Sequence, residues 1–450
     1  MVEGVFSLPP GHHMLLYVPE RRRMPRARAW WDATRSAAHK SDVPRNLASA
    51  ASRLRPMLQD AVRAHLLADV PVGLFLSSGL DSAAIAALAA PQRAGIRSFT
   101  LTFPGTPYDE APLARVVAQH CGTQHKEVPL DANAIFARID EALAALDQPT
   151  MDGINTYFVS WAAREVGLKV ALSGLGGDEL FAGYSTFTDT QRLSRLVRLA
   201  SFTPAPLRHA IAPLFRAMIA RQNSPDAARK AVAAWCSPDR LPHPYFFARS
   251  LYPVTQLSQL IAPRFRPSAV AADGITLEPT WLGWLERAGD AARKMEPLAA
   301  TSWLELRCYM ASTLLRDTDS VSMAESLEVR VPLLDTPLVE FMASLPDTVR
   351  RRDGTQKALL VEALKDALPP SILAQPKRTF TLPWEDWLRG PLRPKLEGSF
   401  ANIAPALAPH LNAKGVRDVW SAFLTGRTSW SRPWSLYVLN EWCRSHLSES

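Results

Sequence analysis

A tight polar turn near residue 80 has the residue types of an anion site. The turn, Ser77-Ser78-Gly79-Leu80-Asp81-Ser82, lies between the uncharged apolar run Val72–Leu76 and the alanine-rich segment Ala83–Ala90. Such a run is typical of a buried parallel strand, and such a segment is typical of a helix packed on a sheet. In this order they direct backbone N–H groups and a helix dipole at one place, which binds anions, usually phosphate. The sequence therefore predicts a phosphate site; the alternative is an ordinary strand–helix turn with serine caps.

A second polar turn runs from Ser173 to Tyr184. Its glycines, Gly174, Gly176 and Gly177, allow close approach of the backbone to a ligand. Two acids, Asp178 and Glu179, follow directly. Carboxylate oxygens are hard ligands that Mg²⁺ prefers, and protein-bound Mg²⁺ often bridges to substrate phosphates. We therefore expect a magnesium site here; the alternative is that these acids only cap a helix.

A sheet must position these turns, and the hydrophobic pattern predicts one. The expected helices are Asn46–Ala68, Tyr108–Cys121 with Gly122 as its stop, Ala132–Leu146 and Asn155–Val166. The expected strands, besides Val72–Leu76, are Ile96–Phe103, Lys126–Leu130 and Val170–Leu172. Strands that alternate with helices at this spacing predict an α/β fold with a doubly wound parallel sheet. Such sheets bind ligands at the carboxyl ends of their strands, where Ser77, Phe103 and Ser173 fall, so we expect these stretches to converge on one crevice.

The segments before and after the predicted sheet differ from it in composition and in predicted secondary structure. Residues 1–45 predict two short strands, one ending at Ser7 and one at Leu15–Tyr17, followed by the basic linker Arg21–Lys40. We expect residues 46–450 to form one domain, with a helical Arg- and Pro-rich insertion at 185–298 and a helical C-terminal part. Further helices are expected at Pro297–Leu315 and Ser320–Leu327. We expect the tryptophans of the C-terminal part to pack in the core rather than to form a binding platform; they are Trp384, Trp387, Trp420, Trp430, Trp434 and Trp442.

Composition limits the classes of function. The 450 residues are 47% hydrophobic, which is ample for a large core, and the net charge of +8 is spread along the chain except at Arg21–Arg23 and Arg350–Arg352. Neither run is interleaved with aromatic residues, so a nucleic-acid partner is not expected. The four cysteines lie far apart with no C-x-x-C, and no signal peptide or membrane span is evident. We expect a cytoplasmic enzyme with anionic small-molecule substrates and no membrane partner.

The serine turn is neither a Walker A loop nor a dinucleotide fingerprint, because it has no Gly-Lys-Ser/Thr and no G-x-G-x-x-G. It resembles the PP-loop, S-G-G-x-D-S, of the ATP pyrophosphatases, with Ser78 in place of the first glycine. A wider set of motifs supports the resemblance: S-F-T-L-T-F (98–103), G-T-Q-H-K-E (122–127), S-G-L-G-G-D-E-L-F-A-G-Y (173–184), L-L-R-D-T-D-S-V-S-M-A-E-S-L-E-V-R-V-P-L-L-D (314–335) and K-R-T-F (377–380). In this order they resemble the synthetase domain of glutamine-dependent asparagine synthetases from about residue 46 to 440.

The resemblance implies an adenine nucleotide α-hydrolase-like fold and an ATP- and Mg²⁺-dependent ligase. ATP would adenylate a carboxylate, with aspartate the leading substrate, and ammonia would then displace AMP. The pyrophosphate would be held by Ser77, Ser78, Gly79, Leu80, Asp81 and Ser82. The adenine and ribose positions would be Phe75, Leu101, Ser173 and Gly174. Asp81 and Asp178 match the magnesium ligands, and Lys377 matches a lysine that steadies the pyrophosphate; without the resemblance, Lys377 would be taken for a solvated lysine and Arg330 for a structural ion-pair partner.

Two departures from the family pattern matter. Position 2 is valine, where the glutaminase domain of the family has a catalytic cysteine, and Leu8–Gly11 resembles the end of that domain. We therefore expect no glutamine hydrolysis by this chain, and ammonia that is free or comes from a glutaminase partner. Leu175 replaces the family's glutamate and cannot take a proton, and the segment Asp147–Asp152 lacks the arginine expected for aspartate. The alternatives are an amidotransferase for another carboxylate, such as a sugar acid or a peptide, and a non-catalytic subunit.

Overall fold

The computed structural model describes residues 7–16, 26–33, 43–222, 224–262, 279–352, 354–375 and 381–447. At its centre is a sheet of five parallel strands in the order β5-β4-β3-β6-β7. The strands are β3 (Val72–Phe75), β4 (Arg97–Thr102), β5 (Gln124–Pro129), β6 (Val170–Leu172) and β7 (Glu328–Arg330). The predicted doubly wound α/β sheet is confirmed, and β7 is an additional strand that the sequence pattern did not indicate.

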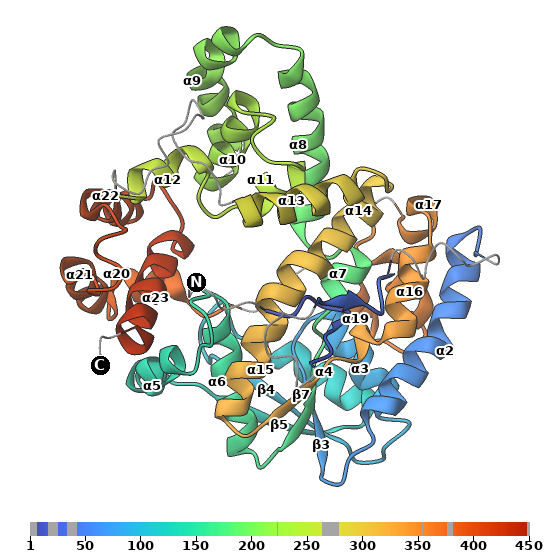
Figure 1. Ribbon diagram of the computed structural model, residues 1–450. Coiled ribbons are helices and arrows are strands. Elements are labelled where there is room, and N and C mark those ends of the chain that lie inside the picture. The colour runs from blue at the N-terminus through green and yellow to red at the C-terminus, as the bar shows by residue number, and fades with distance from the viewer. Residues whose placement is uncertain are drawn as a thin grey trace.

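Helices cover both faces of the sheet (Figure 1). On one face lie α2 (Leu47–His65), α3 (Leu80–Ala89) and α4 (Ala111–Cys121), and on the other lie α5 (Ala132–Ala144) and α6 (Gly153–Glu165). The chain changes face where it crosses from β5 back to β6. This crossing makes β6 a direct neighbour of β3, with Gly73 opposite Ala171, so the turns that follow these two strands meet at the same edge.

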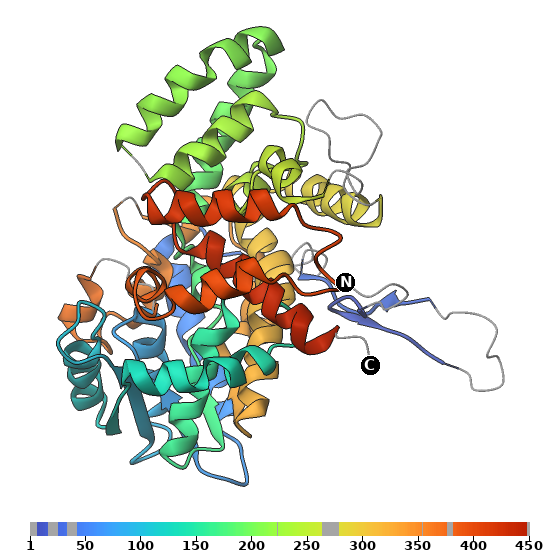
Figure 2. The same cartoon turned by 90° about the vertical axis from the view of Figure 1, so that its left-hand side faces the viewer.

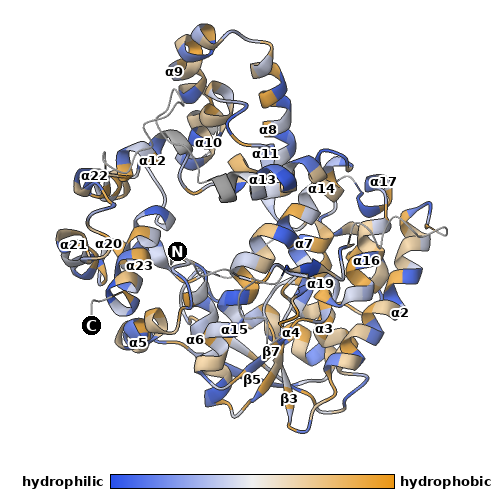
Figure 3. Ribbon diagram, viewed as in Figure 1, coloured by the Kyte–Doolittle hydropathy of each residue, from blue (hydrophilic) through white to orange (hydrophobic). Residues whose placement is uncertain are grey.

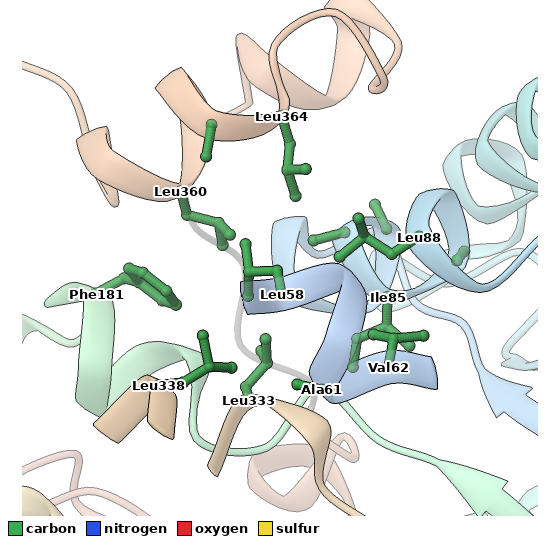
Figure 4. Packing of buried hydrophobic residues seen from close by; sticks show 14 of the residues in the cluster. Leu58, Ala61, Val62, Ile85, Leu88, Phe181, Leu333, Leu338, Leu360 and Leu364 are labelled. Carbon is green, nitrogen blue, oxygen red and sulfur yellow. The ribbon is translucent and has the colours of Figure 1, made fainter. Parts of the chain in front are cut away.

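The first face is closed by helices from the C-terminal half. They are η3 (Pro332–Leu334), α16 (Thr336–Ser344), α17 (Asp347–Arg350), α18 (Ala358–Leu364) and α19 (Pro370–Leu373). Figure 4 shows Leu58 and Val62 of α2 packed between Ile85 of α3 and Leu360 of α18, all fully buried. Burial of each such side chain contributes about 1.5–3 kcal/mol, so this cluster holds α3 and its preceding turn firmly against the sheet.

One long helical run covers the other face. It consists of α14 (Pro297–Leu304), a π-helical stretch η2 (Glu305–Leu314) and α15 (Leu315–Ala324), without interruption. The expected break between Leu315 and Ser320 was therefore wrong. Asp317 lies buried in this helix and accepts a hydrogen bond from Thr150, and α15 packs along α6. These tertiary contacts outweigh the low helix propensity of the Asp/Thr/Ser sequence.

Residues 185–298 form the expected helical insertion as far as they are described. Its helices are α8 (Ser185–Ser201), α9 (Ala205–Gln222), α10 (Pro225–Cys236), α11 (Pro244–Arg249), α12 (Val254–Leu260) and α13 (Pro279–Ala292). The helices α8 to α11 make a lobe beyond the sheet, at the top of Figures 1 and 2, with a small core of its own around Leu193 and Phe247. Figure 3 shows the contrast with the central layer: α3 is apolar along most of its length, whereas α8 carries many hydrophilic residues.

The C-terminal helices α20 (Trp384–Arg389), α21 (Arg393–Ala401), α22 (Ala413–Leu424) and α23 (Ser431–His446) complete the second core. The prediction that the tryptophans are core anchors is confirmed. Trp384 and Trp434 are fully buried with ring centroids 4.2 Å apart, and Trp430 is half-buried beside them. Among the described residues, no helix has both the length and the apolar composition needed to cross a bilayer.

The N-terminal strands differ from the prediction. β1 (His12–His13) pairs in antiparallel register with β2 (Arg28–Ala29), which comes from the stretch expected to be linker. Leu15 and Leu16 lie outside any strand and are exposed, while Tyr17 and residues 1–6 are outside the described residues. Gly11, with φ +68°, turns the chain so that its carbonyl accepts hydrogen bonds from the N–H groups of Trp30 and Trp31, which selects the later segment as the partner.

Candidate active site

The serine turn joins β3 to α3 at the carboxyl edge of the sheet. The Gly79 N–H donates to Ser77 Oγ over 3.1 Å, Ser82 Oγ donates to the Gly79 carbonyl over 3.0 Å, and the two hydroxyl oxygens lie 2.8 Å apart. These bonds hold the turn in shape. Ser78, which stands where the resembling loop has glycine, donates from Oγ to Glu110 Oε1 over 2.9 Å, and both side chains are buried.

The second turn packs directly on the first. It follows β6 and leads into α7 (Gly177–Phe181). A Cβ atom on Gly174 would lie 2.9 Å from Cβ of Asp81, and one on Gly177 would overlap the Asp81 carboxylate. Glycine is therefore required at both positions, although the close partner is the other turn rather than a ligand. A Cβ atom on Gly183 would likewise overlap the Asp178 carboxylate and the Lys357 side chain.

Two of the predicted residues meet at a lysine. Lys357 Nζ forms an ion pair with Asp81 Oδ2 and a second one, 2.7 Å long, with Asp178 Oδ1. We call Lys357, Asp81 and Asp178 the lysine–aspartate cluster. Burial acts to lower the pKa of Lys357, but the two carboxylates raise it more, so its pKa lies above the ordinary value. The ammonium group marks a point at which two carboxylates from separate strand ends converge on one positive charge.

The sequence analysis missed Lys357. It lies at the N-terminus of α18 in the left-handed conformation, with φ +50°, and is 8% exposed. Its neighbours, T-Q-K-A-L-L, have no motif, and the nearest member of the cluster in sequence, Asp178, is far away. Lys377 and the rest of 376–380 lie outside the described residues, so its predicted place beside pyrophosphate stays a prediction.

The predicted adenine and ribose residues are spread along the same edge. Phe75 is half-buried and meets Phe99 edge to face with centroids 5.2 Å apart, whereas Leu101 is 5% exposed within the core. The Ser173 N–H donates to the Arg330 carbonyl over 2.8 Å, so this backbone is part of the β6–β7 ladder region. Arg330 itself bonds Glu328 and the carbonyls of His65 and Leu67, in agreement with its expected structural role.

The acid after Asp178 faces a tyrosine. Glu179 is buried and accepts a hydrogen bond from the Tyr184 hydroxyl over 3.0 Å. Burial and, second, the charge of Asp178 raise the pKa of Glu179 to about 7. Below that pH the side chain is a neutral acid, and above it this edge of the sheet gains a further negative charge.

The helical insertion also reaches this edge through Arg249 of α11. Its guanidinium makes a two-bond contact with the buried carboxylate of Glu305, over 2.9 and 2.5 Å. It stacks on Tyr309 with Cζ 3.8 Å from the ring centroid and lies 4.8 Å from that of Tyr184. The insertion, in which the sequence showed no motif, therefore positions the aromatic wall next to Glu179.

The segment expected to bind the acceptor is acidic. The Tyr309 hydroxyl donates to Asp152 Oδ2 over 2.8 Å, and the Thr150 hydroxyl donates to Asp317 Oδ2 over 2.6 Å. Burial raises the pKa of Asp317 to about 7; the charges of Asp152 and Asp147 act in the same direction and that of Arg316 opposes them. An arginine from α15, Arg316, pairs with Asp147 over 2.5 Å, and both side chains are exposed. Leu175 is half-buried, and its N–H donates to Ser173 Oγ over 3.4 Å.

The donor set agrees with a magnesium ion in the presence of a nucleotide. Mg²⁺ is usually bound by one or two carboxylates together with substrate phosphates and water. Asp81 and Asp178 are such a pair, and both point at one cation. Within the described ranges, no group of three or more His, Cys, Asp or Glu side chains has the spacing of a self-sufficient metal site. Any divalent ion held by these two carboxylates would complete its coordination with phosphate or water oxygens.

Curated relatives are similar over most of this chain. A putative glutamine-hydrolysing asparagine synthetase of Mycobacterium tuberculosis is 30% identical over 391 residues, which are 86% of this chain and 56% of that protein. Asparagine synthetase 1 of Bacillus subtilis is 27% identical over 338 residues, 75% of this chain and 50% of that protein. A protein named amidase chry2, from Gibberella zeae, is 24% identical over 424 residues, 88% of this chain and 61% of that protein.

The chain thus spans about half the length of the curated relatives that it matches. The sequence model of the asparagine synthase family matches residues 53–444, which is most of the chain and contains both glycine-containing turns and Lys357. This protein therefore belongs to the asparagine synthase family.

Proposed function

We propose that this chain is an ATP-dependent amide ligase that activates a carboxylate as its adenylate. The observation that carries the proposal is the convergence of the serine turn, Asp81 and Asp178 on Lys357 at the carboxyl edge of the sheet. A carboxylate has no leaving group and is a poor electrophile, whereas an acyl adenylate has a good leaving group, which is the reason for using ATP.

In the first step a carboxylate oxygen attacks the α-phosphorus, and the bond between the α- and β-phosphates breaks. The departing pyrophosphate lies over the N–H groups at the start of α3, which favour negative charge. Lys357 supplies a fixed positive charge beside it, in an environment of low polarity where such charges act strongly. Bound magnesium would neutralise phosphate charge between Asp81 and Asp178.

In the second step the nitrogen of ammonia attacks the acyl carbon. The C–O bond to AMP breaks, the nitrogen loses one proton, and the amide remains. Leu175 offers no base, so the nucleophile must enter as neutral NH₃, whose attack needs no prior proton removal. Free ammonia or a glutaminase partner is the proposed source.

Aspartate is the first candidate acceptor, as in asparagine synthetases. A different carboxylate, such as a sugar acid or a peptide side chain, is the second candidate. The segment Asp147–Asp152 favours the second, because it contains no arginine, the neighbouring Arg316 already pairs with Asp147, and a substrate with two carboxylates needs a further cation. Incubation with ATP, Mg²⁺, ammonia and aspartate, scored for AMP and asparagine, separates the two candidates.

Replacement of Asp178 tests the site itself. We expect Asp178→Asn to lower carboxylate-dependent ATP–pyrophosphate exchange by roughly 10²-fold or more, because a metal ligand is lost. The same change should move the melting temperature only modestly, because it removes no core packing and Lys357 keeps its ion pair with Asp81. Equal losses of activity and stability would instead mean that Asp178 only caps α7. A folded wild-type preparation that shows no exchange with any carboxylate would favour the non-catalytic subunit.

A further inference from the structure

A half-open cavity of about 360 Å³ lies between α7, α14, α16 and α17, and no residue of the serine turn or the lysine–aspartate cluster lines it. Its walls are mainly apolar and include Trp303, Leu306, Val339 and Leu345. Its volume is at the small end of the range of about 300–1,000 Å³ that ligand pockets occupy. Two charged side chains, Arg350 and Glu296, also line it.

Arg350 is the unusual member of this lining. Its side chain is 6% exposed, its Nη2 donates to the Leu180 carbonyl over 2.8 Å, and its Nε has no hydrogen-bond partner. Within the described ranges, no carboxylate forms an ion pair with this guanidinium. Burial lowers the pKa of Arg350 to about 10, although the charges of Asp347 and Glu296 partly oppose this shift.

The two nearest acids are engaged elsewhere. The Asp347 carboxylate accepts the N–H groups of Leu298 and Ala299 over 2.7 and 3.0 Å and so caps α14. Glu296 Oε2 accepts the N–H of Asp347 over 2.5 Å. A buried cation without a bonded anion is costly, and an anion that reaches it gains a strong charge-assisted hydrogen bond.

We propose that this cavity binds a small carboxylate with an apolar body, its carboxylate on Arg350 and its body against Trp303 and Leu306. The apolar walls provide the hydrophobic burial, and the guanidinium of Arg350, which lines the cavity and has no paired carboxylate among the described residues, provides the polar contact that fixes orientation. The site is separate from the proposed nucleotide site, and its ligand is neither ATP nor the acceptor.

The cavity is coupled to α7 by two hydrogen bonds to its backbone. Arg350 bonds the Leu180 carbonyl, and Ser302 Oγ donates to the Glu179 carbonyl over 2.7 Å. α7 has only five residues and is bounded on both sides by left-handed residues, Gly176 and Ala182, so its position depends on such contacts. A ligand that draws Arg350 away moves the helix that carries Asp178. This coupling rests on the proposed function; binding to the cavity does not.

Calorimetry with 3-phenylpropanoate tests the binding. We expect saturable binding to the full chain, and binding at least about tenfold weaker for the neutral 3-phenylpropanamide, which cannot neutralise Arg350. Ala343→Trp, at the exposed mouth of the cavity, should abolish binding of the acid. The matched control is Ala217→Trp on the exposed surface of α9, which should bind as the wild type does.

Equal affinity for the acid and the amide would overturn the role of Arg350. Unchanged binding to Ala343→Trp, or no binding to the wild type, would overturn the site. A second titration in the presence of ATP and Mg²⁺ tests the coupling, because linkage requires that each ligand change the affinity of the other by the same factor. We expect a change of about threefold or more in affinity for the acid. An unchanged affinity, in a protein that catalyses ATP–pyrophosphate exchange, would disprove the coupling and leave the binding site standing.

Discussion

Lys357 occupies the point at which the two proposed magnesium ligands meet. The side chain of Lys357 is only 7% exposed, and its ammonium group neutralises the two carboxylates that lie on either side of it. Because the pKa of Lys357 is raised in the folded protein, the cluster stabilises the fold fully at pH values below the ordinary pKa of lysine. This stabilisation is lost only as the pH rises through the higher pKa of the folded state. The cluster is therefore fully formed throughout the neutral range.

We expect Lys357→Met to lower the free energy of unfolding by roughly 3–5 kcal/mol, because it leaves two half-buried carboxylates without their cation. Thermal denaturation without magnesium measures the loss, and added Mg²⁺ should restore part of it. Lys365→Met, an exposed lysine paired with Glu362 on the same stretch of chain, is the matched control and should change little. A variant as stable as the wild type would mean that the two aspartates separate easily.

Asp317 gives a prediction on pH dependence. Its folded pKa of about 7 is above the unfolded value near 4, so its contribution to stability is complete below about pH 4 and is lost as the pH rises to about 7. Asp317→Asn keeps an acceptor for Thr150 and carries no charge. We expect this variant to be more stable than the wild type above pH 7 and to have a flatter stability curve between pH 4 and 7.

Denaturant unfolding at a series of pH values measures this difference. Glu179, with a pKa also near 7, titrates in the same window, so part of the slope should remain. Asp319→Asn, the same change at an exposed position of α15, serves as the control and should leave the curve unaltered. If Asp317→Asn were less stable than the wild type specifically above pH 7, the charged carboxylate would be stabilising and the raised pKa of Asp317 would be wrong.

At the scale of elements, the site depends on how closely α7 approaches the start of α3. A methyl group on Gly177 would overlap the Asp81 carboxylate. That carboxylate could turn aside only by leaving Lys357, which would break the lysine–aspartate cluster. We expect Gly177→Ala to reduce ATP–pyrophosphate exchange by at least about tenfold, because a displacement of about 1 Å at a catalytic group can cost 10²-fold.

Gly398→Ala is a matched control. Gly398 lies within α21 and a Cβ there would meet nothing within 4 Å. This change should stabilise the protein by about 0.5–1 kcal/mol through helix propensity and leave the exchange rate unchanged. Wild-type activity of Gly177→Ala would show that the two turns separate without functional cost.

The element boundaries illustrate how much local sequence can determine. β3 and β6 were predicted to within one residue and α4 ends at the predicted Cys121, since their apolar runs and the stop at Gly122 are local signals. The helix from Pro297 to Ala324 was predicted as two pieces, because Asp317 and Ser320 have low helix propensity. Only their partners, Thr150 and the Ala145 carbonyl, explain why the helix continues.

At the scale of the whole molecule, the helical insertion is connected to the site by one buried ion pair. Arg249 of α11 and Glu305 of η2 form it, and the guanidinium also stacks on Tyr309. We expect Arg249→Leu to lower the free energy of unfolding by roughly 3–5 kcal/mol, because Glu305 is left as an uncompensated buried charge.

The double variant Arg249→Leu/Glu305→Leu should recover much of that loss, because both charges are then gone. Denaturant unfolding of the two single variants and the double variant provides the comparison, and hydrogen exchange of α8 to α11 reports whether the lobe has loosened. A double variant no more stable than Arg249→Leu would mean that the stacking on Tyr309, rather than the ion pair, holds the lobe.

The sequence by itself determined the parallel sheet, the serine turn, the acidic glycine turn and the family, because strands, tight turns and their chemistry depend on residues close together in the chain. Only the tertiary structure shows three sets of ion pairs. Lys357 pairs with Asp81 and Asp178, Arg316 pairs with Asp147, and Arg249 of the insertion pairs with Glu305. Each of these pairs is separated by 56 residues or more. A lone lysine or arginine has no periodicity or motif of its own, and its role is set by which charges the packing of the cores brings within reach.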